Sequence, residues 1–375
     1  MPSGKRMQMA AAGATGGATS LFTWGAGGSG ANGDGTTTTR TSPVIVAEEG
    51  EWLAGRDTFA RGNLTGMGIK TDYTLWTWGE GEFGQNGQSG AFPRRKSIPT
   101  QLGTATNWVK VSIGYKAGSA VNSDGELFTW GRNFSGMLAQ NHNISAISSP
   151  VQVAGTDWAT PIMGKSNSLF IKTNGTLWAA GSGYRGAIGD GTSTTKSSPI
   201  QLGARTDWVD ATVAGRSCGA LTSAGKLYTW GQANVSGQTG HGNKTDLSIP
   251  TQVGALTTWS QISGGWDIFV ALKTDGTLWS WGNGAYGQLG LGDTTSRSSP
   301  VQIGALTDWA QVGACGFSGW GIKTDGTLWG WGKSTNAAWG SGNKSSPVQI
   351  GTDTTWTYVV KMGSRVDEGA SAQKT

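Results

Sequence analysis

Chemistry-bearing residues are scarce in this chain of 375 residues, which contains two cysteines and two histidines. Cys218 and Cys315 lie far apart and have no histidine beside them, so neither a disulfide framework nor a zinc site is expected. His142 and His241 have no serine, cysteine or carboxylate at a spacing typical of a catalytic triad or a metal site. The sequence therefore predicts a protein that is not an enzyme and that needs no metal or cofactor.

Long apolar runs and strong charge are also missing. No run of about 18 apolar residues could cross a membrane, and residues 1–20 lack the apolar segment of a secretory signal. The formal net charge of +5 is small for a chain that binds nucleic acid. We expect a soluble protein made without Sec export, cytoplasmic or assembled into a virion, with protein partners rather than nucleic acid or small molecules.

The chain does contain 20 tryptophans and 64 glycines, and a repeat accounts for both. The motif Leu-x-x-Trp-Gly returns at a step of roughly 50 residues, which is typical of a repeat array or a propeller. A proline and a second tryptophan recur with it. The fourth motif position is occupied, in chain order, by Trp24, Trp78, Trp130, Ala180, Trp230, Trp281 and Trp331.

Each repeat predicts about four short strands. Asp275-Gly276 favours a tight hairpin turn between two alternating runs, and a further strand is expected to start at Pro300 after a glycine-rich loop. No apolar spacing indicates a helix. The fold class is therefore all-β, a seven-bladed β-propeller of four-stranded antiparallel blades, spanning residues 1–363.

The ends of the chain predict how the ring closes. The first complete motif comes early and the last repeat has no hairpin after it, so the last blade is expected to combine both ends. We expect its first strand at residues 357–362 and the other strands within the N-terminal 46 residues. Residues 364–375 are polar and are expected to form a frayed tail.

The stretch from Trp281 to Asp293, Trp-Gly-Asn-Gly-Ala-Tyr-Gly-Gln-Leu-Gly-Leu-Gly-Asp, followed by Ser299-Pro300-Val301, closely resembles the repeat of the regulator of chromosome condensation family. The resemblance extends over about residues 7–362, whereas kelch and WD-repeat signatures are not regular features. It implies a seven-bladed propeller. For function it implies several possibilities: nucleotide exchange on a Ran-type GTPase with chromatin binding, scaffolding in ubiquitin ligases, or inhibition of secreted enzymes. No exchange residue can be carried over to this chain.

Loops that depart from the repeat are the candidate contact sites, because propellers bind through connections on a rigid frame. The alternative for each is a solvated loop or local repacking. The Gly-Asp-Gly-Thr strings at 33–36 and 189–192 are explained by Asx turns rather than by calcium. The partner-binding candidates, expected to be exposed, are Arg56, Phe59, Arg61, Phe92, Arg94, Arg95, Lys96, Phe134, Met137, Leu138, His142, Ile144 and Trp339.

These observations favour a non-enzymatic interaction or structural propeller, and a phage or virion component is the preferred role within that class. A guanine-nucleotide exchange or chromatin-associated regulator is the alternative, although the chain shows no basic nuclear-localisation tail. Glycan binding and enzyme inhibition are further alternatives. The sequence does not name the partner.

Overall fold

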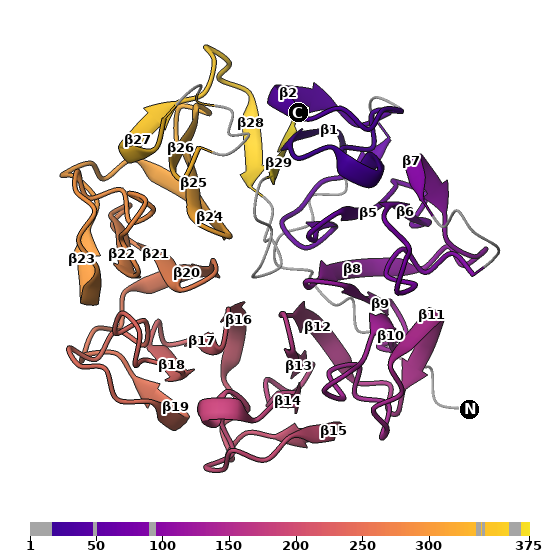
Figure 1. The fold of residues 1–375 in the computed structure, drawn as a ribbon, viewed down its shortest axis with the longest axis horizontal. Coiled ribbons are helices and arrows are strands. Elements are labelled where there is room, and N and C mark those ends of the chain that lie inside the picture. The colour runs from indigo at the N-terminus through magenta and orange to yellow at the C-terminus, as the bar shows by residue number, and fades with distance from the viewer. Residues whose placement is uncertain (1–16, 48–50, 90–94, 335–338, 340–341, 360–368) are drawn as a thin grey trace, which may run out of the picture.

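The computed structural model describes residues 17–47, 51–89, 95–334, 339, 342–359 and 369–375. Seven antiparallel sheets surround a central axis, and Figure 1 looks along that axis. The first strand of each sheet lies nearest the axis and the fourth lies on the rim. The predicted all-β, seven-bladed propeller is confirmed, and the described helical elements are two short 3₁₀ turns, η1 (Gly28–Gly30) and η2 (Tyr184–Gly186).

Six blades are built from strands that follow one another in the chain. We number the blades in chain order from the one that joins the two ends. Blade two contains β4 (Phe59–Arg61), β5 (Thr65–Ile69), β6 (Leu75–Gly79) and β7 (Lys96–Gln101). Blade three contains β8 (Trp108–Ile113), β9 (Ala117–Asn122), β10 (Leu127–Arg132) and β11 (Ala146–Val153). Blade four contains β12 (Trp158–Met163), β13 (Asn167–Lys172), β14 (Leu177–Gly181) and β15 (Lys196–Gln201). Blade five contains β16 (Trp208–Ala214), β17 (Ser217–Thr222), β18 (Leu227–Gly231) and β19 (Leu247–Gln252). Blade six contains β20 (Trp259–Gly264), β21 (Ile268–Lys273), β22 (Leu278–Gly282) and β23 (Arg297–Gln302). Blade seven contains β24 (Trp309–Cys315), β25 (Ser318–Lys323), β26 (Leu328–Gly332) and β27 (Lys344–Gln349).

Blade one closes the ring with two strands from each end of the chain. Its order is β2 (Arg40–Ile45), β1 (Ala18–Gly25), β29 (Gly369–Lys374) and β28 (Trp356–Val359), and the short β3 (Trp52–Leu53) also pairs with β1. The expected frayed tail at 364–375 is therefore wrong, because residues 369–374 form an interior strand, with Phe22 opposite Ala372. The N-terminal region supplies two strands rather than three. Residues 1–16 and 360–368 lie outside the described residues.

The predicted hairpin turn is stabilised by one repeated set of hydrogen bonds. At Asp275-Gly276, the Asp275 carboxylate accepts from the Thr277 amide (3.0 Å) and hydroxyl (2.6 Å). The same hydroxyl accepts from Trp279 Nε1 at 2.8 Å. Gly276 has a φ of +77°, a conformation that glycine adopts without steric cost. Equivalent bonds recur at Asp72, Asn174 and Asp325.

The motif tryptophans fill the space between blades and also join them. Trp281 is fully buried, and its indole N–H donates to the Gln238 carbonyl of the preceding blade at 3.0 Å. Trp78, Trp130, Trp230 and Trp331 make the same bond to a loop of the preceding blade. Each motif therefore covers apolar surface on two sheets, as a propeller of small sheets requires.

Blade four lacks this indole because Ala180 stands at the motif position. Ser168, directly opposite Ala180 in the sheet, donates from its hydroxyl to the Met137 carbonyl at 2.6 Å. Met137 and Leu138 pack into the same buried cluster as Ala180. The serine thus replaces the bond between blades, and the apolar loop residues cover the site of the missing ring.

The rim strands start earlier than expected. Pro300 lies inside β23 rather than at its start, opposite a register irregularity between Ser280 and Gly282. An edge strand accepts proline there because the missing N–H has no ladder partner to lose. The predicted strand is confirmed, and its predicted first residue is wrong.

Candidate protein-interaction face

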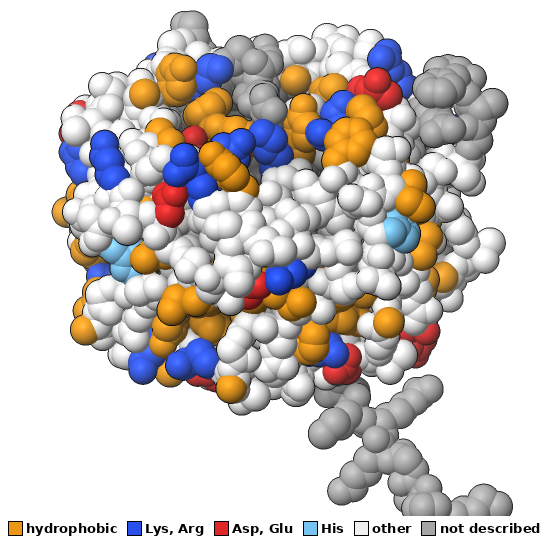
Figure 2. Space-filling model, turned by 60° about the horizontal axis from the view of Figure 1, so that its bottom comes forward, with side chains coloured by type: hydrophobic (Ala, Val, Ile, Leu, Met, Phe, Trp, Pro, Cys, Tyr) orange, Lys and Arg blue, Asp and Glu red, His pale blue; other side chains and the backbone are white. Residues whose placement is uncertain are grey.

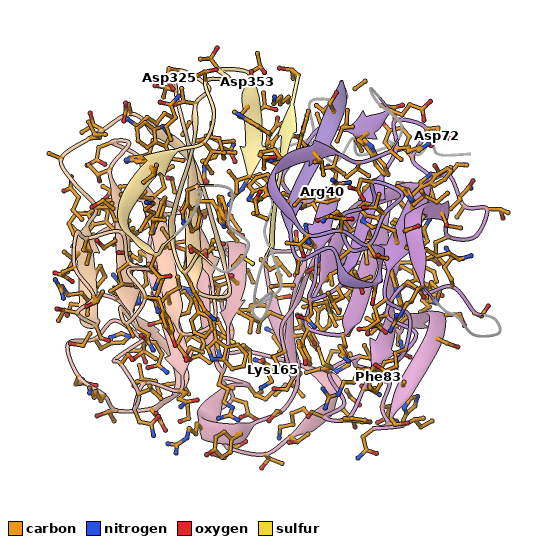
Figure 3. All side chains as sticks on the ribbon, turned by 45° about the horizontal axis from the view of Figure 1, so that its top comes forward. Arg40, Asp72, Phe83, Lys165, Asp325 and Asp353 are labelled. Atoms are coloured by element: carbon orange, nitrogen blue, oxygen red, sulfur yellow. The ribbon has the colours of Figure 1, made fainter. Side chains whose placement is uncertain are left out.

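The two faces of the ring carry different connections. In blades two to seven the inner turn, between the first and second strands, and the outer loop, between the third and fourth, open on one face. The hairpin turns between the second and third strands open on the other. Figure 3 shows this division, with Phe83 and Lys165 at one end of the blades and Asp72, Asp325 and Asp353 at the opposite end.

Aromatic side chains recur on the face of inner turns and outer loops. Phe134, Tyr184 and Tyr286 in the outer loops are 50%, 49% and 39% exposed. Phe83 in an outer loop is half-buried, as are the inner-turn residues Tyr115, Trp266 and Phe317. These residues and the cations over their rings are named the aromatic–cation face. Its members are Phe83, Tyr115, Lys116, Arg132, Phe134, Lys165, Tyr184, Arg185, Arg216, Trp266, Tyr286, Phe317 and Lys333.

Cations on this face lie over aromatic rings. Arg132 lies 4.3 Å from the Phe134 ring centroid, and Arg216 lies 4.9 Å from that of Tyr184. Such cation–π contacts each contribute about 0.5–1 kcal/mol when exposed, and they restrict long side chains to few rotamers. The remaining contacts are Lys116 over Phe83 (4.3 Å) and Tyr115 (5.8 Å), Arg132 over Phe83 (6.0 Å), Lys165 over Trp266 (4.5 Å), Arg185 over Tyr184 (5.1 Å), and Lys333 over Phe317 (5.3 Å) and Tyr286 (5.4 Å).

Most of these contacts join different blades. Lys116 of blade three lies over Phe83 of blade two, while Lys165 of blade four lies over Trp266 of blade six. Figure 2 shows Lys and Arg side chains gathered with hydrophobic ones across the upper part of the molecule, with few acidic side chains among them. The arrangement is a rigid surface of mixed aromatic and basic character.

Acidic groups neutralise part of this face. Lys116 lies 3.8 Å from Glu80 and 3.4 Å from Glu82, and Arg185 pairs with Asp246 at 2.7 Å. Among the described residues, Arg132, Arg216 and Lys333 have no ion-pair partner within 4.0 Å. All three lie against aromatic rings, and Arg216 also interacts with the charge of Asp267.

Asp267 is the partly buried carboxylate of the blade-six inner turn. Desolvation by burial raises its pKa to about 6, while the positive charges of Arg216 and Lys165 act in the opposite direction. Its carboxyl group is therefore half-protonated near pH 6, within the physiological range. The charge of the face consequently depends on pH.

The opposite face holds its lysines differently. Lys273 lies 3.6 Å from the Trp279 ring and 4.9 Å from the Trp259 ring, and is 8% exposed. Lys70, Lys172, Lys323 and Lys374 occupy the same place between two aromatic rings, each paired with a carboxylate. These caged lysines stabilise the blades and offer little charge to a partner.

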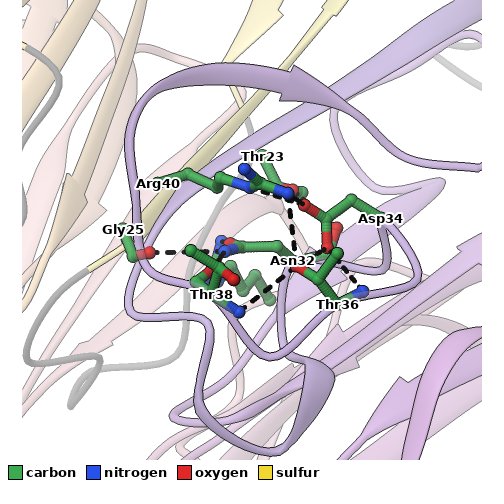
Figure 4. Close-up of polar contacts among 8 residues, drawn as sticks. Thr23, Gly25, Asn32, Asp34, Thr36, Thr38 and Arg40 are labelled. Carbon is green, nitrogen blue, oxygen red and sulfur yellow. Dashed lines mark hydrogen bonds and ion pairs between the residues drawn. The ribbon is translucent and has the colours of Figure 1, made fainter.

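The outer loops owe their shape to Asx turns. In blade one, Asp34 accepts from the Thr36 amide at 3.1 Å and pairs with Arg40 at 2.6 Å, and Asn32 donates to the Gly25 and Thr38 carbonyls (Figure 4). Asp190 and Asp293 repeat the turn and the ion pair. Across the described residues, no three His, Cys, Asp or Glu side chains gather as a metal site. Turn formation accounts for these strings as expected.

Five of the predicted contact residues are buried, so their expected exposure is wrong. Phe59 and Arg61 are 1% and 0% exposed, because the inserted segment of blade two folds into the core. Met137 and Leu138 are buried against Ala180, and Trp339 packs on Trp320 with ring centroids 4.9 Å apart. These side chains shape the fold rather than its surface.

The other predicted residues are scattered. Phe134 is exposed and belongs to the aromatic–cation face. Ile144, Arg95 and Lys96 are exposed in or directly after outer loops but are not among the aromatic–cation contacts, and His142 is half-buried. Arg56 donates to the Val312 carbonyl at 3.1 Å, so it is bound to the inner strand β24 of blade seven. Phe92 and Arg94 lie outside the described residues.

Sequence reasoning missed most of the face. An aromatic three or four positions after the motif glycine was a readable signal for Phe83, Tyr184 and Tyr286. The inner-turn residues Lys165 and Trp266 gave no such signal, because their pairing depends on how blades are arranged around the axis.

Seven antiparallel blades of four strands around one axis define the class of seven-bladed β-propeller repeat proteins. The family model described as the RCC1-like domain matches residues 20–366, and the chain belongs to this family. The resemblance read from the sequence is confirmed.

Two curated relatives illustrate the range of the family. The ultraviolet-B receptor UVR8 of Arabidopsis thaliana is 29% identical over 276 residues, which is 70% of this chain and 60% of that protein. The mouse E3 ubiquitin-protein ligase HERC2 is 27% identical over 238 residues, 60% of this chain and 5% of the ligase. The chain thus spans less than two thirds of either relative.

Solved structures agree on the fold. Yeast RCC1 (Prp20), in a complex with Kap60, has a TM-score of 0.82 at 18% identity, covering 97% of this chain and 90% of that one. Human WBSCR16 has a TM-score of 0.80 at 19% identity, covering 95% and 100%. Identity at this level carries the fold alone.

No helix among the described residues is long and apolar enough to span a membrane.

Proposed function

We propose that this chain is a non-enzymatic interaction propeller whose protein partner docks on the aromatic–cation face. The observation that carries the proposal is the convergence of seven aromatic and six basic side chains from six blades on one face. Aromatic residues and arginine dominate the binding energy of protein interfaces. Their mutual stacking reduces the side-chain entropy that a partner would otherwise have to restrict.

The relatives support the coarse part of this proposal. Yeast Prp20 has been solved bound to Kap60, and it has binding properties towards Gsp1p and histones. HERC2 is named as a ubiquitin-protein ligase, in which the matched part is 5% of the length. These partners belong to those proteins, and a protein partner of some kind is the property that extends to this chain.

The finer roles remain predictions. None of the relatives named above is a phage or virion component, so a role in a particle has no support beyond the sequence argument. Nucleotide exchange or chromatin regulation is the alternative, supported by the fold shared with Prp20. No residue of this chain favours exchange specifically, and location inside the cell or in a particle is equally a prediction.

Cross-linking with mass spectrometry on protein from its native source tests the docking face. Lys165 and Lys333 lie on the aromatic–cation face, whereas Lys226 lies at a hairpin turn on the opposite face. We expect reproducible links from Lys165 and Lys333 to one partner, absent from Lys226.

A matched pair of variants gives the control. The triple change Phe134→Ala, Tyr184→Ala and Tyr286→Ala should abolish those links. Ile249→Ala, Leu256→Ala and Leu306→Ala remove equally exposed apolar side chains elsewhere, which are 56%, 47% and 48% exposed, and should leave them intact. Links that survive the first triple, or that arise from Lys226 instead, would reject the proposed face.

A further inference from the structure

Three cations on the aromatic–cation face lack ion-pair partners among the described residues. Arg132 lies against Phe134, Arg216 against Tyr184, and Lys333 between Phe317 and Tyr286. By contrast, Lys116 and Arg185 on the same face each have a carboxylate. Lys165 and Arg216 both interact with the charge of Asp267. Among the described residues, Arg132, Arg216 and Lys333 are thus the cations of blades three, five and seven that lie against rings without a carboxylate within 4.0 Å.

Ring-held cations are suited to bind carboxylates. An aromatic face fixes the guanidinium plane without using its N–H groups, which stay free to form two parallel bonds to a carboxylate. The rings also shield the site from water, so a new ion pair there is screened less than one on an open surface. Arg216 is exposed, and Arg132 and Lys333 are half-exposed, so a partner can reach all three.

The same face disfavours a polyphosphate chain. Glu80, Glu82, Asp246 and Asp267 lie among the cations and would oppose a continuous line of phosphates. The aromatic rings between the cations offer apolar contact instead. A segment with spaced carboxylates and apolar side chains fits both features, whereas a nucleic acid would need a denser basic surface.

We propose that the partner presents an acidic protein segment, in which Asp or Glu side chains pair with Arg132, Arg216 and Lys333 while apolar side chains pack on Phe134, Tyr184 and Tyr286. This inference rests on the proposed function, because it names the chemistry of the partner at that face. The face should therefore select acidic segments over basic ones, so that replacing the acidic residues of the partner by basic residues prevents binding.

Fluorescence anisotropy with labelled peptides tests the inference on the full chain. The probe is a synthetic peptide that alternates Glu with Leu and Phe, and its control is the same peptide with every Glu replaced by Lys. We expect the acidic peptide to bind, the Lys peptide not to bind, and the acidic peptide to bind more weakly as salt rises.

The variant arm uses R132Q, R216Q and K333Q together. Its control of equal charge change is K110Q, R205Q and K226Q, three cations in or near the connections that open on the other face. The first triple should weaken binding at least about tenfold and the second should leave it unchanged, because charge pairs act through close contact. Equal loss in both triples, equal binding of the Lys peptide, or stronger binding of a DNA duplex of the same charge would overturn the inference.

The two proposals fail in different ways. If cross-links from Lys165 and Lys333 are lost in the aromatic triple but persist in R132Q, R216Q and K333Q, the docking face stands and the acidic partner is rejected. If both triples leave the links intact, the docking face and the acidic partner are both rejected. Circular dichroism and thermal unfolding confirm that each variant remains folded.

Discussion

Arg61 is fully buried, in a strand position where blade three has the apolar residue Ile113. Its guanidinium donates to the carbonyls of Trp24 (2.8 Å), Ala26 (2.8 Å) and Ala370 (3.4 Å), and to Asn32 Oδ1 at 2.9 Å. Burial lowers its pKa to about 10, so it remains charged at neutral pH. One side chain of blade two thereby holds strands from both ends of the chain in blade one.

We expect Arg61→Ala to lower the free energy of unfolding by at least about 3 kcal/mol, because four buried acceptors lose a charged donor at once. Urea denaturation followed by tryptophan fluorescence measures the change. Arg297→Ala, which removes a partly exposed pair with Asp293, should cost less than about 1 kcal/mol. Similar losses in the two variants would contradict the role of Arg61.

Asp267 predicts a pH dependence of stability. Its pKa is raised to about 6 in the folded protein, so between an ordinary value near 4 and pH 6 the folded state binds a proton that the unfolded state has released. The free energy of unfolding should therefore fall as pH rises through this window. The upper bound on the fall is about 3 kcal/mol. Solvent screening of the partly exposed side chain makes the actual fall smaller. Urea unfolding between pH 4 and pH 7 measures this component.

Asp267→Asn supplies the control for that titration. The asparagine cannot ionise, so the variant should be more stable than the natural chain at neutral pH and similar to it near pH 4. Arg216 and Lys165 lose a negative neighbour in the variant, which limits the gain. Parallel pH profiles for the two proteins would show that Asp267 does not titrate in this range.

Among the elements, the hairpins of blades two, four, six and seven are each stabilised by a caged lysine. Lys323 lies over Trp309 at 5.4 Å and Trp329 at 4.5 Å and pairs with Asp308 at 3.2 Å. We expect Lys323→Ala to cost about 1–2 kcal/mol, since the cation–π contacts and the packed stem are lost together. Lys226→Ala, at a turn without such rings, should change stability little. Differential scanning calorimetry compares them, and equal melting temperatures would contradict the cage.

The elements also show how far sequence reasoning reaches. The motif residues Leu278 and Trp281 and the Asp275-Gly276 turn predicted strands, hairpins and core correctly, because each is a local signal repeated with one period. The start of β23 was misplaced because proline is tolerated inside an edge strand. For the candidate face, Phe134 was found from an irregular loop. The contact of Lys165 with Trp266 could not be found, because it depends on the inner turns meeting around the axis.

At the scale of the whole molecule, β29 is an interior strand between β28 and β1. Deleting residues 369–375 should therefore expose two sheet edges and remove the closure, and we expect thermal unfolding to lose its cooperativity. Adding the peptide 369–375 in excess should restore part of the transition. A truncated chain that melts sharply at the original temperature would show that the ring does not depend on this strand.

The strand order of blade one also determines when the protein can finish folding during synthesis. Blades two to seven use consecutive strands, so each can pair as soon as its residues leave the ribosome. The strands β1 and β2 are made before the other strands of the propeller, yet β1 must wait for a partner that is made after every other blade. Until residues 369–374 appear, one edge of β1 stays open on the growing chain. Among the strands of the propeller, the earliest to be made is therefore the one that needs protection from pairing with the wrong strand for longest.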